Sequence, residues 1–355
     1  MQIQLVIGEQ DSRYLNNLLL FLEKNHMDKL EIFSFSRSDM LQEYFSNRKA
    51  DVILVDERFG IEAESLKCFG KVAYLCDSVS EPVSDGIRRI AKYKKPDLIY
   101  KDILDLYAES GNRGSFQAKA AGTGNMVLVT SFSGGVGAST FAVALAKKYA
   151  SRGKKTLYLN LETVGSSADF FSGTGNYRFE DVIFALKSQR TDVRLKMESA
   201  VRVDKSGVAF FEPCSTAMYM LELTTEDIVR IVDVLELART YEYVVVDINF
   251  QLSKEFLEIM KRMDRVILVA DGTETANTKF VRTLQALSIL ESQTKSNVTG
   301  NMSVVYNKFS SSKSSSEIPE LRMPVIGKLP PVKHALVHEI VDFMLSRQEI
   351  FEKLS

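Results

Sequence analysis

The chain has 355 residues, of which 45% are hydrophobic and 26% are charged, with 19 Gly and 7 Pro. This composition is typical of a globular protein of two or three domains, and it excludes a disordered or fibrous chain. The 45 basic and 46 acidic residues leave a formal net charge of -1. No overall attraction to nucleic acid or anionic lipid follows from such a charge, so sequence-specific nucleic-acid binding is not predicted.

The cysteines and the apolar segments indicate the compartment. Cys68, Cys76 and Cys214 show no metal-ligand spacing, and their odd number fits a reducing environment. The N-terminal sequence has no basic segment before a long apolar core, and nowhere do about 18 apolar residues follow one another without charge. We therefore expect a cytoplasmic protein without an integral membrane segment.

Residues 1–110 alternate between short apolar runs and amphipathic stretches. The run at 52–55 is apolar throughout, as in a central parallel strand that helices cover on both faces, and Asp56 follows at its carboxyl end. The pattern predicts a doubly wound, five-stranded α/β domain. Strands are expected at 2–7, 30–35, 52–55, 72–75 and 90–93, and a closing helix at 98–106.

Residues 111–123 lose this periodicity and fill with Gly, Ser and Ala, which is typical of a linker. Residues 124–355 then resume the alternation and predict a second parallel α/β sheet. An amphipathic stretch at 339–354 is expected to form one closing helix that packs on the core rather than on a membrane. Strands are expected at 126–130, 156–159, 243–246, 265–269 and 302–306.

A glycine-rich loop follows the first strand of this second domain, and a helix is predicted after it at 139–150. A strand, a glycine-rich turn and a helix in this order present backbone N–H groups and a helix N-terminus to a phosphate chain. We predict a phosphate-binding loop; the alternative is a tight turn in which glycine serves packing alone. The Walker A pattern is not matched, because Phe132 stands at its first glycine and Ala138 at its lysine. The loop consists of Ser133, Gly134, Gly135, Val136, Gly137, Ala138, Ser139 and Thr140.

The segment FSGGVGASTFAVALA resembles the deviant Walker A loop of the ParA/MinD ATPase superfamily. Its GGVGAST portion is similar to the loop of the CpaE/TadZ branch, the pilus-assembly proteins of the tight-adherence (Flp) system. Ser133 stands at the superfamily's signature lysine. The resemblance spans about residues 124–340 and implies a P-loop NTPase-like (ParA/MinD-type) domain that binds ATP and Mg²⁺. It also implies a homodimer through the nucleotide face.

The same resemblance implies roles for residues beyond the loop. Asp247, after the strand at 243–246, matches the Walker B aspartate, which holds Mg²⁺ through water, and Ser139 is the loop's own metal ligand. Asn160 and Glu162 occupy the switch I positions, where the superfamily shows Asp-x-Asp and uses a carboxylate to orient the attacking water. These three residues, Asn160, Glu162 and Asp247, are the candidate catalytic residues.

Two further segments resemble the part of the site that surrounds the base. Asn307, after the strand at 302–306, resembles the asparagine that reads adenine. Pro330 and Pro331 resemble the proline-containing loop beside the base. With the glycine-rich loop, these residues complete the expected nucleotide-binding set.

Residues 1–110 resemble a response-regulator receiver, a flavodoxin-like domain, and CpaE/TadZ proteins are similar in carrying an atypical receiver. Asp56 stands at the phospho-acceptor position, and Lys95 with the following proline matches the lysine after the fifth strand. Glu9 and Asp11 match the Mg²⁺-binding acidic pair, but Gln10 separates them. We therefore expect Asp56 to be phosphorylated inefficiently.

Together these features predict an ATP-binding, dimerising assembly or localisation factor. Its partners would be pilus-assembly or polar-localisation proteins, and it would be recruited to a cell pole or an inner-membrane assembly. Little hydrolysis is expected, because neither lysine position of the loop is filled and Asn160 replaces an acid. The alternatives are an active ATPase that cycles between an ATP-bound dimer and an ADP-bound monomer, and a signalling protein driven by phosphorylation.

Overall fold

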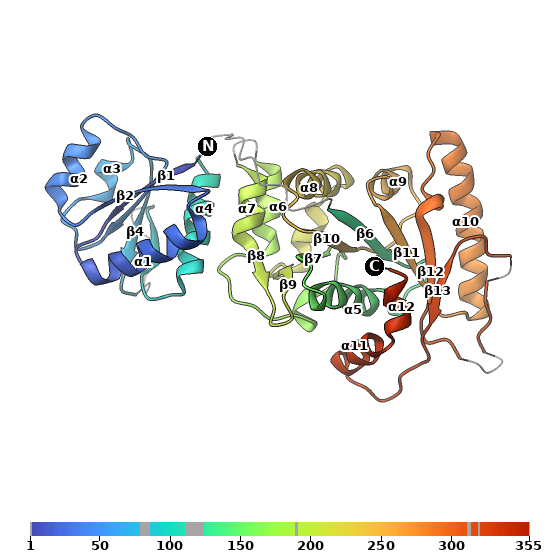
Figure 1. Ribbon diagram of the computed structural model, residues 1–355. Helices are drawn as coiled ribbons and strands as arrows, with labels where there is room; N and C mark the ends of the chain where they lie inside the picture. The colour runs from blue at the N-terminus through green and yellow to red at the C-terminus, as the bar shows by residue number, and fades with distance from the viewer. Residues whose placement is uncertain are drawn as a thin grey trace. The chain divides into compact units, whose positions relative to one another are not determined.

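The computed structural model describes residues 2–78, 86–110, 124–188, 191–310, 314–318 and 320–354 (Figure 1). The chain folds into two units. The first comprises residues 1–117, 175–177 and 184–200, and the second comprises 118–174, 178–183 and 201–355. The predicted linker at 111–123 lies outside the described residues.

The first unit is a parallel sheet of five strands in the order β2-β1-β3-β4-β5, which is the flavodoxin-like order. Alternate residues of β3 pack on opposite faces: Leu54 lies in the apolar cluster with α1 and α4, and Ile53 in the cluster with α2 and α3. This confirms the receiver-like fold. The elements are β1 (Ile3–Gly8), α1 (Ser12–His26), β2 (Leu30–Phe35), α2 (Ser38–Phe45), β3 (Val52–Asp56), α3 (Ala63–Leu66), β4 (Lys71–Cys76), β5 (Arg88–Ala91) and α4 (Pro96–Ala108).

One strand of this unit differs from its predicted position. The sequence predicts a strand at 90–93, but β5 ends at Ala91. Lys92 therefore follows the strand directly, and its N–H donates to the carbonyl oxygen of Cys76 in β4 at 2.8 Å. This difference of two residues decides which lysine lies at the carboxyl end of the sheet.

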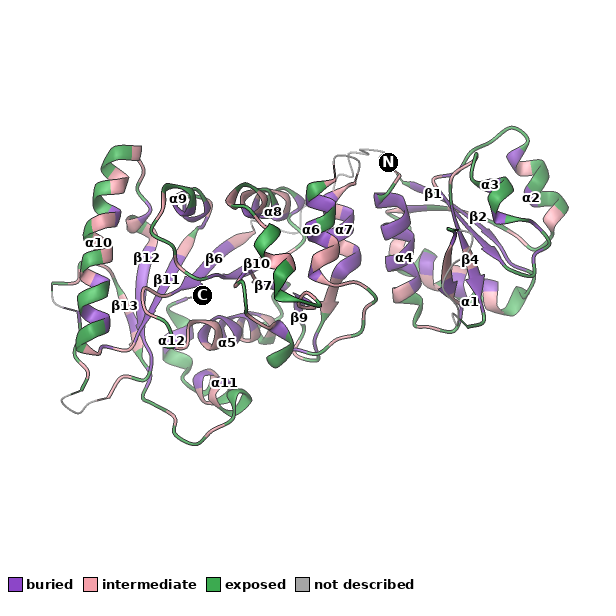
Figure 2. Cartoon of the chain, turned by 180° about the vertical axis from the view of Figure 1, so that it is seen from behind, coloured by how far each residue is buried: buried purple, intermediate pink, exposed green. Residues whose placement is uncertain are grey.

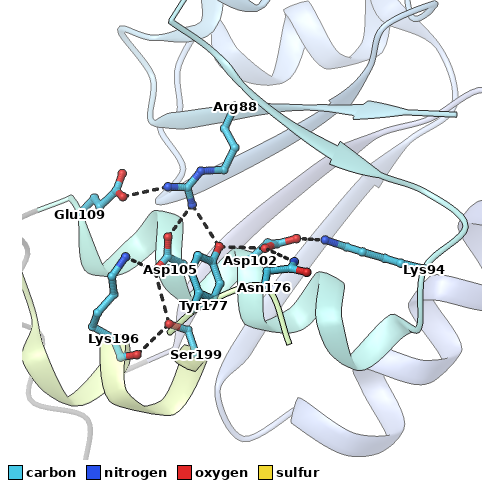
Figure 3. Close-up of polar contacts among 9 residues, drawn as sticks. All are labelled: Arg88, Lys94, Asp102, Asp105, Glu109, Asn176, Tyr177, Lys196 and Ser199. Carbon is cyan, nitrogen blue, oxygen red and sulfur yellow. Dashed lines mark hydrogen bonds and ion pairs between the residues drawn. The ribbon is translucent and has the colours of Figure 1, made fainter. Parts of the chain in front are cut away.

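Helix α7 (Val193–Ala200) belongs to the first unit, although its position in the sequence lies within 124–355. Leu195 is buried in the cluster that α4 also contributes to. Asp105 of α4 is fully buried, pairs with Lys196 of α7, and accepts a hydrogen bond from Arg88 Nη1 at 2.6 Å (Figure 3). An apolar contact and a buried ion pair therefore both hold α7 against α4.

A second buried carboxylate on α4 binds a neighbouring part of the chain. Asp102 pairs with Lys94 and accepts hydrogen bonds from Tyr177 Oη at 2.8 Å and from Asn176 Nδ2 at 3.1 Å (Figure 3). Residues 175–177 thus join the first unit through the same helix. Helical periodicity in the sequence predicts that one face of a helix is apolar, but it does not show which element packs against that face.

The second unit is an eight-stranded sheet in the order β13-β12-β11-β6-β10-β7-β9-β8, parallel except for the β8–β9 pair. Its fold confirms the predicted P-loop NTPase-like class. The strands are β6 (Asn125–Thr130), β7 (Thr156–Asn160), β8 (Val201–Val203), β9 (Val208–Phe211), β10 (Tyr243–Asp247), β11 (Arg265–Ala270), β12 (Met302–Tyr306) and β13 (Val325–Lys328). The helices are α5 (Ala138–Ser151), α8 (Thr225–Ala238), α9 (Lys254–Met260), α10 (Glu274–Thr294), α11 (Val337–Ser346) and α12 (Gln348–Glu352), with 3₁₀ turns η1 (Ser167–Asp169), η2 (Ala217–Glu222) and η3 (Thr299–Asn301). Helix α6 (Phe179–Lys187) contributes residues to both units.

The end of the chain packs on the core of the second unit, as predicted, but not as one helix. Arg347 has φ -88° and ψ 68°, which is not helical, and it separates α11 from α12. Met344, Ile350 and Phe351 are buried in the cluster that also contains the apolar face of α5. Figure 2 shows α11 and α12 next to α5. Within the described residues, no helix has the length and apolar character needed to cross a bilayer.

Candidate functional site

The glycine-rich loop lies between β6 and α5, at the carboxyl end of a central strand (Figure 1). Gly135 and Gly137 have φ values of 75° and 90°, a conformation in which an L side chain would be strained. Gly137 is the N-cap residue of α5, and among the described residues no side chain caps this helix and no acid lies in its first turn. The first N–H groups and the positive end of the helix dipole can therefore bind an anion.

Two consecutive side chains after β12 hold this loop. Asn307 Nδ2 donates to the carbonyl oxygen of Val136 at 2.8 Å, and Lys308 Nζ donates to the carbonyl oxygen of Gly135 at 2.7 Å. A Cβ atom at Gly137 would lie 2.4 Å from Asn307 Nδ2, so a larger residue there would displace the amide. The resemblance implied that Asn307 reads the base; in this structure its buried amide also donates to the loop.

The predicted proline segment lies beside the same strand end. The N–H of Leu329 donates to the carbonyl oxygen of Tyr306 at 2.7 Å, and the N–H of Phe309 donates to that of Leu329 at 2.9 Å. Pro330 and Pro331 follow directly and are exposed. The structure thus places both prolines near the residues that hold the loop, although they are far from it in sequence.

Carboxylates from two neighbouring strand ends meet the first turn of α5. Asp247 at the end of β10 is in register with Asn160 at the end of β7. Ser139 Oγ donates to Glu162 Oε2 at 3.0 Å and lies 3.4 Å from Asp247 Oδ1. Asn160 Oδ1 accepts the N–H of Glu162 at 2.9 Å and so orders that segment. The structure therefore brings together the predicted metal and switch residues.

Tyr158 is a site residue that the sequence analysis missed. It lies in β7, and its hydroxyl donates to Asp247 Oδ2 at 2.7 Å. A hydroxyl between two leucines, two residues before the strand end, was the available signal. Burial and, secondly, the Glu162 carboxylate raise the pKa of Asp247 to about 7, against the opposing effect of the hydrogen bonds from Tyr158 and Ser139. A cation bound at this point would favour the ionised carboxylate.

A cavity of about 230 Å³ lies beside Glu162 and is lined mainly by residues 160–167 and 213–217. Large apolar side chains next to it are exposed. Val164 lines the cavity and is 81% exposed, while Met218 and Leu221 in η2 are 65% and 63% exposed. The carboxylates of the site therefore adjoin an apolar surface.

A second charged cluster lies at the carboxyl end of the five-stranded sheet. Lys92 Nζ lies 2.7 Å from Glu9 Oε2 and also pairs with Asp56. The three residues are 6%, 1% and 5% exposed. The ammonium group thus lies between the Glu9 and Asp56 carboxylates. The receiver resemblance implies that Glu9 binds a divalent cation and that Asp56 accepts a phosphoryl group.

The other two predicted receiver-site residues lie outside this cluster. Asp11 is exposed and caps α1, because its carboxylate accepts two backbone N–H groups of the first turn. Lys95 is exposed at the N-cap position of α4, and Lys92 takes the place expected for it because β5 ends at Ala91. In the part of the chain that the structure describes, no three or more His, Cys, Asp or Glu side chains are arranged to hold a metal ion.

The parallel sheet, the glycine-rich loop and the carboxylates define a nucleotide-binding α/β protein. Residues 127–336 match the CobQ/CobB/MinD/ParA nucleotide binding domain, and residues 1–108 match the TadZ-like receiver domain. The chain therefore belongs to the CobQ/CobB/MinD/ParA nucleotide-binding family and carries a TadZ-like receiver domain before its nucleotide-binding domain. Both resemblances found in the sequence are confirmed.

Two solved structures are similar to part of this chain. The ParA family ATPase from Chlorobium tepidum TLS is 16% identical, with a TM-score of 0.50, and the match covers 65% of this chain and 92% of that one. The septum site-determining protein MinD from Pyrococcus horikoshii OT3, solved with Mg-ADP, is 14% identical, with a TM-score of 0.49 and coverage of 65% and 96%. No curated protein matches the sequence. Identities this low concern the fold alone.

Proposed function

We propose that this protein is an assembly or localisation factor of a Flp (tight-adherence) type pilus or secretion apparatus, and that it binds ATP with Mg²⁺. One observation carries the proposal: at the uncapped N-terminus of α5, Ser139 Oγ lies within 3.4 Å of both the Glu162 and the Asp247 carboxylate. Backbone N–H groups supply phosphate contacts that need no lysine. The TadZ-like receiver in front of the domain supports the role in pilus assembly.

The donor set fits Mg²⁺. This ion prefers oxygen ligands, keeps several waters, and takes one or two carboxylates together with substrate phosphates. The Ser139 hydroxyl and the Asp247 carboxylate provide such oxygens, and the Tyr158 hydrogen bond fixes the orientation of the carboxylate. Bound there, the ion would offset the negative charge of two carboxylates and a phosphate chain.

Hydrolysis is expected to be slow. Ser133 and Ala138 leave both lysine positions of the loop unfilled, and a cation on the transferring phosphoryl group can contribute factors of about 10³ to 10⁵ in rate. The Asn160 side chain binds the backbone of Glu162 and cannot act as a base. An active, cycling ATPase is the second candidate, and the position of the Glu162 carboxylate at Ser139 favours it.

We further propose that ATP favours a homodimer through the nucleotide face. The exposed Val164, Met218 and Leu221 beside Glu162 support this proposal. A second subunit that covered these apolar side chains would remove them from water, which would stabilise the dimer. ATP that binds the paired state alone would stabilise it by mass action. Because the loop lacks the lysine that would reach across, we expect the dimer to depend on ATP only modestly.

Two measurements on the full chain test these points. Light scattering with and without Mg·ATP should show a larger dimer fraction with nucleotide in the wild type but not in Gly135→Arg. The rate of phosphate release from ATP by the wild type should be close to that of Asp247→Ala. A monomer under all conditions would contradict the dimer, and fast turnover that Asp247→Ala abolishes would establish the cycling ATPase instead.

A further inference from the structure

The glycine-rich loop lacks a lysine of its own, yet an ammonium group lies on it. Lys308 Nζ donates to the carbonyl oxygen of Gly135 at 2.7 Å from a position 173 residues further along the chain. We infer that Lys308 provides a cation that binds the phosphate chain of the nucleotide at this loop, where Ser133 and Ala138 supply none. The inference rests on the proposed binding of a nucleoside triphosphate.

The backbone around Lys308 is shaped so that two successive side chains reach the loop. The N–H of Asn307 donates to the carbonyl oxygen of Ala270 in β11 at 2.7 Å, which fixes the end of β12. Lys308 then adopts φ 57°, a left-handed conformation that is unfavourable for an L residue. As a result, Asn307 and Lys308 bind the adjacent carbonyls of Val136 and Gly135. A strained non-glycine residue persists where the surroundings hold it in place, and such positions cluster at ligand sites.

The chemistry of the ammonium group suits a phosphate chain. It carries three N–H donors, and the contact with Gly135 uses one of them. Lys308 is exposed, so an entering anion can reach it. Lys328, a second described lysine near this strand end, is already paired with Glu317 and lies over the ring of Phe309. Of these two described lysines, Lys308 is therefore the one in position to face the ligand.

The left-handed conformation makes a sharp test possible, because glycine at this position relieves strain while it removes the charge. For Lys308→Gly we expect an unchanged or higher thermal midpoint without nucleotide, and an affinity for Mg·ATP about tenfold weaker by calorimetry. Lys308→Arg should keep the affinity within about threefold, because the charge remains. The loss should be larger for ATP than for AMP, because the effect of a cation grows with the charge of the ligand.

Lys295 offers a matched control. It is also an exposed lysine of the second unit with a left-handed backbone, at φ 52°, but it terminates α10 and its backbone N–H binds Glu291. Lys295→Gly should leave the ATP affinity unchanged. If Lys308→Gly binds ATP as well as the wild type, or if it loses ATP and AMP equally and Lys308→Arg is as weak, the inference is wrong. If the wild type itself binds no ATP, the proposed function fails first.

Discussion

Replacing Lys92 by methionine tests whether a lysine has taken the place of the receiver's divalent cation. Methionine keeps most of the apolar stem and removes the charge. The ammonium contacts Glu9 and Asp56, and all three groups are at least 94% buried. Removing one partner of a buried ion pair costs about 3–5 kcal/mol, because the remaining charge is left uncompensated. We expect a loss of this size in the free energy of unfolding at neutral pH.

The same substitution should create a dependence on Mg²⁺. Without the ammonium, Glu9 and Asp56 present two neighbouring carboxylates, which are suitable ligands for Mg²⁺. Free ion at about 100 times its dissociation constant would restore about 2.7 kcal/mol. Urea denaturation of the full chain without nucleotide, with and without Mg²⁺, measures both effects, and Lys71→Met, at an exposed lysine at the start of β4, is the control. A loss below about 1 kcal/mol, or an equal Mg²⁺ effect on the wild type, would refute the reasoning.

Three further outcomes follow from the structure. A small-molecule phosphodonor with Mg²⁺ should not change the mass of the protein; a gain that Asp56→Asn abolishes would contradict the internal ion pair. Asp105→Ala should lower the free energy of unfolding by about 3–5 kcal/mol, whereas Glu258→Ala, which breaks the exposed pair with Lys261, should cost less than about 1 kcal/mol; equal effects would disprove the docking of α7. Because the folded state raises the pKa of Asp247 from 3.8 to about 7, it binds a proton that the unfolded chain releases, so stability without nucleotide should fall as pH rises from about 4 to 7. Denaturation of Asp247→Asn should show a flatter profile, and an unchanged slope would exclude this group as the cause.

Much of the site could be predicted because its parts lie at strand ends. The family resemblance assigned Asp247 and Asn160 to two strand ends, and parallel strands bring their carboxyl ends to one edge. Asp247 is accordingly in register with Asn160 and lies 3.4 Å from Ser139 Oγ. The glycines in the sequence of the loop also predicted the unusual φ values that the structure shows. These features depend on local sequence and on the order of the strands.

The remaining contacts depend on tertiary register, which one sequence does not reveal. The lysine-proline match assigned Lys95 to the end of the fifth strand, which was predicted at 90–93. The strand ends two residues earlier, and Lys92 pairs with Asp56. Lys308 lies 173 residues from the loop that it binds. In the sequence, Lys308 is one lysine after a strand, and nothing next to it indicates that it contacts the loop.

The most direct test of the nucleotide-binding claim is a calorimetric titration of the full chain with Mg·ATP, performed in parallel on the wild type and on Gly137→Ala. Gly137 has φ 90°, and a Cβ atom there would lie 2.4 Å from the Asn307 amide, so the substitution disturbs the phosphate loop at its centre. The matched control is Gly153→Ala, because Gly153 has φ 76° just past the end of α5 and a Cβ atom there would meet nothing within 4 Å. We predict saturable binding by the wild type and by Gly153→Ala, and at least tenfold weaker binding by Gly137→Ala. Absence of binding by the wild type, or equal binding by all three proteins, would contradict the account.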